Sequence, residues 1–423
     1  MQSEPFLSSL LRQILKTAAF SSQTMKSLYY VRSTLVSAAA LVAVSATAAP
    51  LFSLGDNTAL FINSEAGVEY NSNILRTESN EDSETTFIVR PGIEITHGGE
   101  GAAMTTFTAG WEVRRYDTYS EFNGEYARLN LNTSYDSGVT LFSGVASFNE
   151  YSGTSGVLEP GVGSETLTIP VLNERAESRL GGNVKYRLSD RLALGAGGEY
   201  WGRTYQNGPQ GRTLVNLDRY EVPLRVFYNI APRLDVVAGY RYREVQIGDS
   251  PVGQPKPSDY DDHYFFVGLD GEIFNPLWSA SLDLGFQERN YSDGTQSVDS
   301  FTANGRITYQ ADANRSYYLL LTRDYSVSPV GASSYVQNQA TVGANYRLNE
   351  MWSLMAAANY AVTDYDGSDR EEDLFYVLGG ISYSPNEYVS INARVRLTTI
   401  DGEGTGATNF DNEFISLSAS IRY

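Results

Sequence analysis

The sequence predicts an all-β fold, a transmembrane up-and-down antiparallel β-barrel of about 18 strands, with about 16 as the alternative. Three observations predict it. Side chains alternate between apolar and polar along most of the chain, short turns alternate with long polar loops, and the final alternating segment ends on an aromatic residue. Successive side chains of a strand point to opposite faces, so such segments are apolar on one side and polar on the other. In a closed membrane barrel the apolar face meets lipid and the polar face lines the lumen.

The segment 414–423 shows this alternation most clearly. Arg422 and three serines share one face of it. The apolar residues of the other face are Ile415, Leu417, Ala419, Ile421 and Tyr423. A final strand of this kind resembles the terminal signature that the assembly machinery of bacterial outer membranes reads. We therefore expect these five residues to form a C-terminal assembly signal.

The bulk composition narrows the fold class. The chain has 423 residues, 42% of them hydrophobic and 12% aromatic, and it has no cysteine, so it forms no disulfide. After the N-terminal region no run of about 18 apolar residues occurs, so we expect no membrane-spanning helix. The formal net charge of -19 argues against nucleic-acid binding by phosphate neutralisation.

The N-terminus has the pattern of a signal peptide. Lys26 and Arg32 form a charged segment, residues 35–44 are apolar, and Ala46 and Ala48 mark a small-residue cleavage site. The alternative is a structural N-terminal helix.

No linker or shift in composition follows residue 50, so one architecture is expected. The predicted division is an N-terminal extension and signal peptide over 1–48, with Met25 as a candidate start, a short periplasmic lead-in over 49–58, and the barrel over 59–423.

The connections predict the sidedness of the barrel. Short turns rich in Gly, Pro, Asn and Asp are expected at 97–101, 136–138, 189–191, 229–233, 274–277, 312–314, 349–350 and 384–386. Long polar loops are expected at 76–84, 151–173, 206–216, 248–262, 364–373 and 401–412. Outer-membrane barrels place short turns in the periplasm and long loops outside.

The alternation within individual strands indicates which side chains face the lipid and which face the lumen. The clearest alternation lies in 234–243, 280–289, 336–348 and 389–398. Two other segments, 317–325 and 374–384, fit either register, which leaves the facing of Arg323 undecided.

Aromatic residues gather beside the short turns. They are Tyr135, Tyr186, Tyr228, Trp278, Tyr309, Tyr346, Trp352 and Tyr383. Their amphipathic rings suit a membrane–water boundary. The alternative is the general preference of aromatic residues for strands.

The face expected to point inward is rich in arginine. Candidate lumen-lining residues are Arg90, Arg114, Arg128, Arg179, Arg225, Arg241, Arg243, Arg289, Arg306, Arg347, Arg394 and Arg396. Carboxylates share that face, among them Glu94, Glu112, Glu177, Glu199, Glu221, Asp235, Asp270, Glu272 and Asp283. Guanidinium groups pair with carboxylates, phosphates and sugar hydroxyls. Two interpretations follow: arginine–carboxylate ladders that brace the lumen, or a path for anionic or hydroxyl-rich solutes.

Catalytic and metal chemistry find no support in the sequence. The two histidines, His97 and His263, are far apart and lack partners at metal-ligand spacing. Acidic loop segments look like solvated surface rather than a cation site. We predict no enzyme activity, no catalytic residue, no metal and no cofactor.

Strand ends resemble a known family. Residues 69–76, Glu-Tyr-Asn-Ser-Asn-Ile-Leu-Arg, are similar to the strand end that opens members of the putative β-barrel porin 2 family, with Asn71 and Ser72 in place of acidic residues. An Arg-x-Tyr pattern at 114–116, 289–291 and 323–325 is also similar. The resemblance implies a Gram-negative outer-membrane barrel, often associated with exopolysaccharide or capsule systems, and it implies no catalytic residues.

These observations together predict an integral protein of the bacterial outer membrane. The expected function is a porin-like channel for passive passage or export of hydrophilic solutes, with exopolysaccharide as a candidate. The alternatives are an adhesin or ligand-binding barrel with a closed lumen, and a structural anchor of the envelope. Expected partners are the lipid bilayer, lipopolysaccharide, the barrel assembly machinery and a polysaccharide, but no nucleic acid. The barrel is expected to be a monomer.

Overall fold

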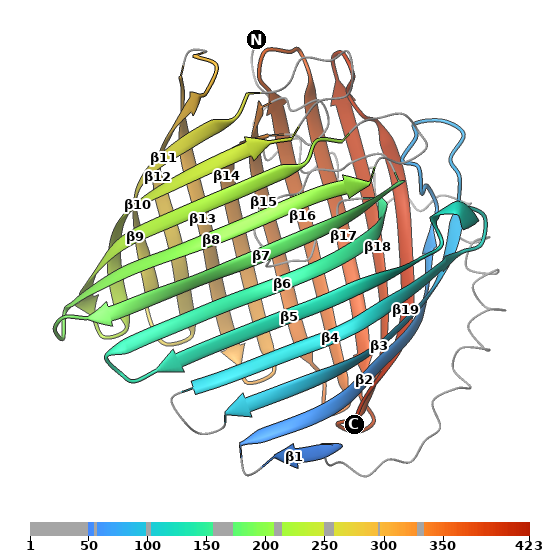
Figure 1. The fold of residues 1–423 in the computed structure, drawn as a ribbon, viewed down its shortest axis with the longest axis horizontal. Helices are drawn as coiled ribbons and strands as arrows, with labels where there is room; N and C mark the ends of the chain where they lie inside the picture. Colours follow the sequence, from blue (N-terminus) through green and yellow to red (C-terminus); the bar gives the residue numbers. More distant parts are fainter. Residues whose placement is uncertain are drawn as a thin grey trace.

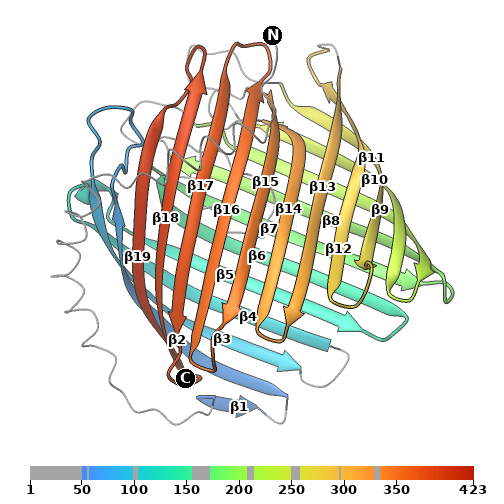
Figure 2. The same ribbon diagram turned by 180° about the vertical axis from the view of Figure 1, so that it is seen from behind.

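The computed structural model describes residues 50–54, 57–98, 103–154, 172–206, 214–248, 258–294, 297–327 and 334–423. These residues form one antiparallel sheet of 19 strands that closes on itself (Figures 1 and 2). The short β1 pairs with β2, and the remaining 18 strands form the ring. The last strand, β19, closes it by pairing with β2 from Phe414↔Asn71 to Arg422↔Asn63. The predicted barrel of 18 strands is therefore confirmed.

The strands follow one another around the ring in chain order. Their bounds are β1 (Phe52–Leu54), β2 (Thr58–Asn71), β3 (Glu84–Gly98), β4 (Ala103–Tyr116), β5 (Gly124–Asp136), β6 (Thr140–Thr154), β7 (Leu172–Arg187), β8 (Leu192–Gln206), β9 (Leu217–Ala231), β10 (Leu234–Ile247), β11 (Tyr260–Glu272), β12 (Trp278–Tyr291), β13 (Val298–Asp312), β14 (Arg315–Val327), β15 (Ser334–Arg347), β16 (Trp352–Tyr365), β17 (Glu371–Tyr383), β18 (Val389–Glu403) and β19 (Phe410–Arg422). A 3₁₀ turn, η2 (Ser120–Phe122), lies between β4 and β5. Within the described ranges, no helix has the length and apolar character needed to cross a membrane. The predicted cleavage site at Ala46 and Ala48, with the rest of the predicted signal peptide, lies outside the described residues.

The outer face is apolar. Large hydrophobic side chains such as Leu180, Val267 and Phe286 are more than 60% exposed. The five apolar residues of the last strand share this face, with Leu417 opposite Ala393 and Ile421 opposite Val389. Water would penalise such a surface, whereas lipid would stabilise it.

Aromatic rings border the apolar face at the end where the short turns lie. Trp278 stacks on Tyr309 with ring centroids 4.6 Å apart, and Trp352 packs on Tyr383 at 4.4 Å. These rings are neighbours across paired strands rather than neighbours in sequence. The arrangement fits an interfacial girdle.

The short turns close by side-chain to backbone hydrogen bonds. The Oδ1 atom of Asn349 accepts from the N–H groups of Met351 and Trp352, both at 2.9 Å. Asp136 accepts from the N–H of Gly138 at 2.7 Å, and this glycine has a φ of +79°, which other residues rarely adopt. These turn residues explain why the sequence located the turns well.

The strands extend further toward the long-loop end than the sequence indicated. Segment 248–262 was expected to be loop, but β11 already begins at Tyr260. Likewise β17 begins at Glu371 and β18 continues to Glu403. The 18 strands of the ring have 13 to 16 residues, longer than the roughly 9–11 that a bilayer requires. The polar ends that resembled loops are therefore strand.

The structure settles the two ambiguous segments. On β14, Tyr317 and Arg323 pair with Ala344 and Asn338 and face outward. On β17, Val377 and Ile381 are exposed on the outer face. The pairing of β14 with β13 ends at Ala303↔Arg323, so the rest of β14 is no longer tied to that neighbour.

Candidate functional site

The twelve arginines that the sequence proposed as lining the lumen all lie on strands, on the face opposite the exposed apolar side chains, and their role as a lumen lining stays a prediction. Each occupies a strand position that alternates with the lipid-facing residues. Their surroundings differ, however. Most are bound to carboxylates, while a smaller group is not.

The first arginine–carboxylate network lies on β2 to β5. Glu112, 1% exposed, is its centre. Three arginines donate to it: Arg90 at 2.7 Å, Arg114 at 2.8 Å and Arg128 at 2.5 Å. Arg90 also contacts Glu65 at 3.1 Å, and Arg114 contacts Glu69 at 3.0 Å. Three positive and three negative charges balance, which makes this network a brace.

A second set of ion pairs crosses β7 to β10, where each of three glutamates bridges two arginines. The pairs are Glu177 with Arg175 and Arg203, Glu199 with Arg179 and Arg219, and Glu221 with Arg241 and Arg243. Inward rings lie between the guanidinium groups. Trp201 is 4.5 Å from Arg203 and 5.0 Å from Arg219, and Tyr264 is 4.0 Å from Arg241. Cation–π contacts of this kind add to the ion pairs.

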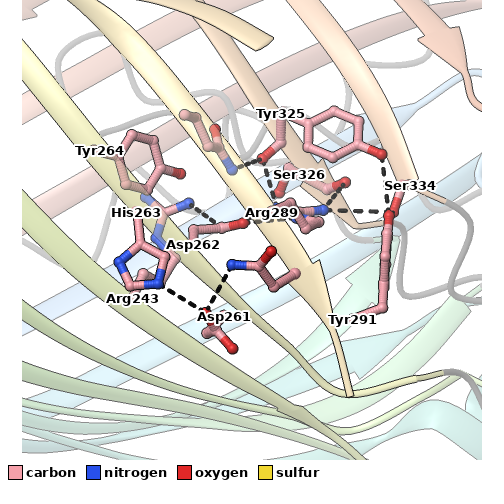
Figure 3. A network of polar contacts seen from close by, with 12 residues as sticks. Arg243, Asp261, Asp262, His263, Tyr264, Arg289, Tyr291, Tyr325, Ser326 and Ser334 are labelled. Atoms are coloured by element: carbon pink, nitrogen blue, oxygen red, sulfur yellow. Dashed lines mark hydrogen bonds and ion pairs between the residues drawn. The ribbon is translucent and has the colours of Figure 1, made fainter. Parts of the chain in front are cut away.

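Figure 3 shows the network of polar contacts around Arg289. This side chain is 0% exposed and makes a bidentate pair with the equally buried Asp262, at 2.7 and 3.0 Å. Arg289 also donates to the backbone carbonyls of Tyr325 at 2.9 Å and Ser326 at 3.2 Å. These carbonyls belong to the end of β14 that no longer pairs with β13. Because buried carbonyls need donors, Arg289 substitutes for the missing strand partner.

The network extends beyond Arg289. Nη1 of Arg243 lies 3.8 Å from carboxylate oxygens of Asp262 and Asp324. The hydroxyl of Tyr291 hydrogen-bonds with Ser334 at 2.8 Å and with Tyr325 at 3.1 Å (Figure 3). The guanidinium groups of Arg243 and Arg289, two of the residues proposed as lumen-lining, are thus largely occupied by contacts that hold strands together.

The inner face of β13 to β18 is different. Between Asp324 and Glu372 at the long-loop end and Asp312 at the short-turn end, its inward positions carry hydroxyl, amide and apolar side chains and four arginines, but no carboxylate. We call this surface the carboxylate-free wall. Its arginines are Arg306, Arg347, Arg394 and Arg396. Within the described ranges, none of the four has a carboxylate oxygen within 4 Å.

Rings hold two of these four arginines. Arg306 lies 5.4 Å from the ring of Tyr318, and Arg396 lies 5.3 Å from that of Phe414. Arg347 and Arg394 are exposed and, among the described residues, contact neither a ring nor a carboxylate. Both line a cavity of about 360 Å³ near the short-turn end.

The strand end that carries the family-like motif anchors the first loop. Asn73, 0% exposed, donates from its backbone N–H to Oδ1 of Asn412 at 3.2 Å and from Nδ2 to the carbonyl of Asp411 at 3.1 Å. Its side chain also exchanges two hydrogen bonds with the backbone of Thr77, at 2.7 and 3.0 Å. The motif therefore fastens the loop across the seam where β19 meets β2. Sequence analysis missed this role, although consecutive Asn and Ser residues at a strand end are a recognisable signal for it.

A second buried anchor lies beside it. Glu84, 2% exposed, accepts hydrogen bonds from the backbone N–H groups of Asp117, Thr118 and Tyr119 at 2.8, 3.2 and 3.0 Å. Burial, and then a hydrogen bond to Asp82, raises the pKa of Tyr119 to about 12. The loop between β4 and β5 is thereby tied to β3.

The loop between β2 and β3 carries both a cation and an anion with shifted pKa values. Burial, followed by the positive charges of Arg396 and Arg175, lowers the pKa of Arg76 to about 9. Burial, followed by the charges of Asp411 and Glu413, raises the pKa of Glu81.

Elsewhere the described residues contain no group of three or more His, Cys, Asp or Glu side chains able to hold a metal. His97 hydrogen-bonds to Thr58 at 2.7 Å near a short turn. His263 lies between Tyr240 at 2.7 Å and Asp261 at 3.0 Å toward the long-loop end. The two histidines lie on different strands, β3 and β11, each with its own partners.

Comparisons with known proteins agree with this architecture. Residues 274–423 match the family model described as Putative beta-barrel porin 2, which confirms the resemblance seen in the sequence. The match spans β12 to β19 and does not include the motif around Asn73. No curated protein matches the chain.

Three solved porin structures also resemble the chain. The chain is similar to a BenF-like porin from Pseudomonas fluorescens Pf-5, with 11% identity, a TM-score of 0.47, and coverage of 86% of this chain and 99% of that one. It is also similar to opdK from Pseudomonas aeruginosa, with 13% identity, a TM-score of 0.47, and coverage of 86% of this chain and 99% of that one. A third similar structure is OpdO from the same organism, with 12% identity, a TM-score of 0.48, and coverage of 86% and 97%.

Proposed function

We propose that this protein is a porin-like channel, integral to the bacterial outer membrane, that passes hydrophilic solutes and favours anions. Acidic saccharides, including fragments of exopolysaccharide, are the solutes that the residues of its lumen suit best. A barrel of about 18 strands encloses a lumen wide enough for an aqueous path.

One observation supports the proposed preference of the channel for anions. The carboxylate-free wall has four arginines and no opposing carboxylate between its ends, whereas the arginines of β2 to β10 are largely neutralised by glutamates. A surface of one sign in a low-dielectric enclosure raises the local concentration of the opposite ion. Anions therefore enter the lumen with a more favourable free energy than cations do.

The test is single-channel recording of refolded protein in a planar bilayer with a KCl gradient. The wild-type reversal potential should show chloride preference. Arg394→Glu should shift selectivity toward potassium, whereas the matched control Arg323→Glu, on the outer face, should not. If the channels open but Arg394→Glu leaves their ion selectivity unchanged, the proposed preference for anions is wrong.

The alternative, a ligand-binding barrel with a closed lumen, is supported by the dense packing toward the long-loop end. Asn73, Glu84 and Arg289 are each at most 2% exposed there. A protein that is folded by circular dichroism and gel mobility but never conducts would favour this alternative over the channel.

The remaining expectations concern partners. The outward residues of β19 support recognition by the barrel assembly machinery, and the apolar outer face supports contact with lipid and lipopolysaccharide. A monomer is proposed because the ring closes within one chain. Sedimentation of the detergent-solubilised barrel tests this, and a discrete trimer would contradict it.

A further inference from the structure

We infer that the carboxylate-free wall contains a specific binding site for a carboxylate-bearing sugar, placed between Arg347 and Arg394 near the short-turn end. The inference deepens the proposed function and rests on it, because it assigns an acidic saccharide to one place in the lumen.

The register places the two arginines at opposite sides of a shallow floor. Four strands, β15 to β18, contribute two adjoining rows of cross-strand neighbours. The first row is Arg347, Ser353, Ser382 and Asn392, and the second is Asn345, Met355, Gly380 and Arg394. Arg347 and Arg394 are three strands apart, roughly 14 Å at the usual strand spacing. Each can extend its side chain toward the other over residues that are mostly small.

The floor is polar but uncharged. Ser353, Ser382 and Asn392 supply hydroxyl and amide groups, and Gly380 supplies no side chain at all. A Cβ atom at Gly380 would lie 2.8 Å from Cγ of Met355, so the thioether of Met355 fills part of the space above this glycine. None of the residues lining the cavity has a carboxylate.

The two guanidinium groups remain available to a ligand. Other inward arginines are engaged by carboxylates or rings, and Arg187, which has neither, donates to the carbonyl of Gly138 at 2.8 Å. Arg347 and Arg394 make no such side-chain contact within the described ranges. An arginine fork binds a carboxylate through two parallel hydrogen bonds, and this pairing is stronger than a neutral hydrogen bond.

The geometry selects the class of ligand. Two cationic groups separated by a neutral floor fit an extended molecule that is anionic toward its ends and hydroxylated between them. A cavity of about 360 Å³ lies at the small end of ligand pockets and suits a short oligosaccharide. A short oligomer of uronic acid has these properties. A single phosphate ion is too compact to meet both arginines and the floor.

Isothermal titration calorimetry on the refolded full chain in detergent tests the site, with a linear trimer of galacturonate as the probe. Maltotriose, which is neutral, and inorganic phosphate, which is compact, are the comparison ligands. The trimer should bind the wild type, and binding should weaken at least tenfold in the Arg347→Gln, Arg394→Gln double variant. Arg323→Gln removes a positive charge from the outer face and should leave affinity unchanged.

The site would be overturned by no binding of the trimer to folded wild type, by equal affinity in the double variant, or by equal binding of maltotriose. Equal affinity for phosphate would also overturn it, because any anion would then suffice. Bilayer recording separates this test from that of the channel. If the barrel conducts but does not bind the trimer, the proposed channel stands and the proposed binding site is wrong. If the barrel binds the trimer but does not conduct, the binding site stands and the channel is wrong.

Discussion

Replacing Arg289 with methionine should destabilise the barrel more than replacing any exposed inward arginine. The change leaves Asp262 buried with only Arg243, at 3.8 Å, as a cationic neighbour. Removing one partner of a buried pair costs about 3–5 kcal/mol. The carbonyls of Tyr325 and Ser326 also lose donors, at about 1–3 kcal/mol for each buried group. The losses share one side chain and do not add in full, so we expect about 4–6 kcal/mol in total.

The assay is urea unfolding of the refolded barrel in lipid vesicles, followed by tryptophan fluorescence. The matched control is Arg179→Met, because Arg179 is 44% exposed and its partner Glu199 keeps Arg219 at 3.3 Å. An exposed pair contributes about 0–1 kcal/mol, so the control should change stability little.

A second substitution should partly compensate for the loss of Arg289. In an Asp262→Asn background, Arg289→Met should cost less, because no buried charge is left without its partner. If Arg289→Met alone costs no more than the Arg179→Met control, the guanidinium does not hold the free end of β14, and our account of Figure 3 is wrong.

Three further predictions test the two faces and the loops. Leu417→Arg, on the lipid face, should cost about 2–4 kcal/mol of unfolding free energy in vesicles, whereas Ser418→Arg, on the inner face, should be nearly neutral; equal costs would reverse the assignment of faces. Asn73→Ala should cost about 1–3 kcal/mol and speed proteolytic cleavage within 72–83; an unchanged cleavage rate would contradict the anchoring role. The pKa of Glu81 is raised in the fold, so its loop should be most firmly docked at low pH and should loosen as the pH rises through that raised value. Hydrogen exchange of the loop at several pH values measures this, and a loop that loosens on acidification would refute it.

The sequence predicted the features that depend on short-range periodicity. Alternation with a period of two gave the facing of strands such as 389–398, and Asn and Gly residues gave the turns, because both follow from local backbone geometry. The same alternation led to the proposal of the twelve arginines as lumen-lining, which stays a prediction. Strand ends were less well predicted, because the strands are longer than a bilayer requires and the polar residues at their ends suit strand and loop equally.

The sequence could not show which arginines are neutralised. Glu112 and its partner Arg114 are two residues apart, but Arg90 and Arg128 reach the same carboxylate from neighbouring strands. The departure of β14 from β13 was also hidden, because segment 317–325 fits either register and only the barrel brings Arg289 to the backbone of Tyr325. Both features depend on register between strands, which no single segment encodes.

Some inward arginines are neutralised by carboxylates and others are not, and this difference helps to explain why Arg347 and Arg394 are present. An arginine that braces a barrel needs a carboxylate or a buried carbonyl, as Arg289 has. Arg347 and Arg394 are exposed and have neither among the described residues, so they add little to folding stability. Glutamine at these positions would satisfy the same polar surroundings without charge repulsion. Two charges that stability does not require, facing a floor without carboxylates, are best explained by an anion that passes or stops there.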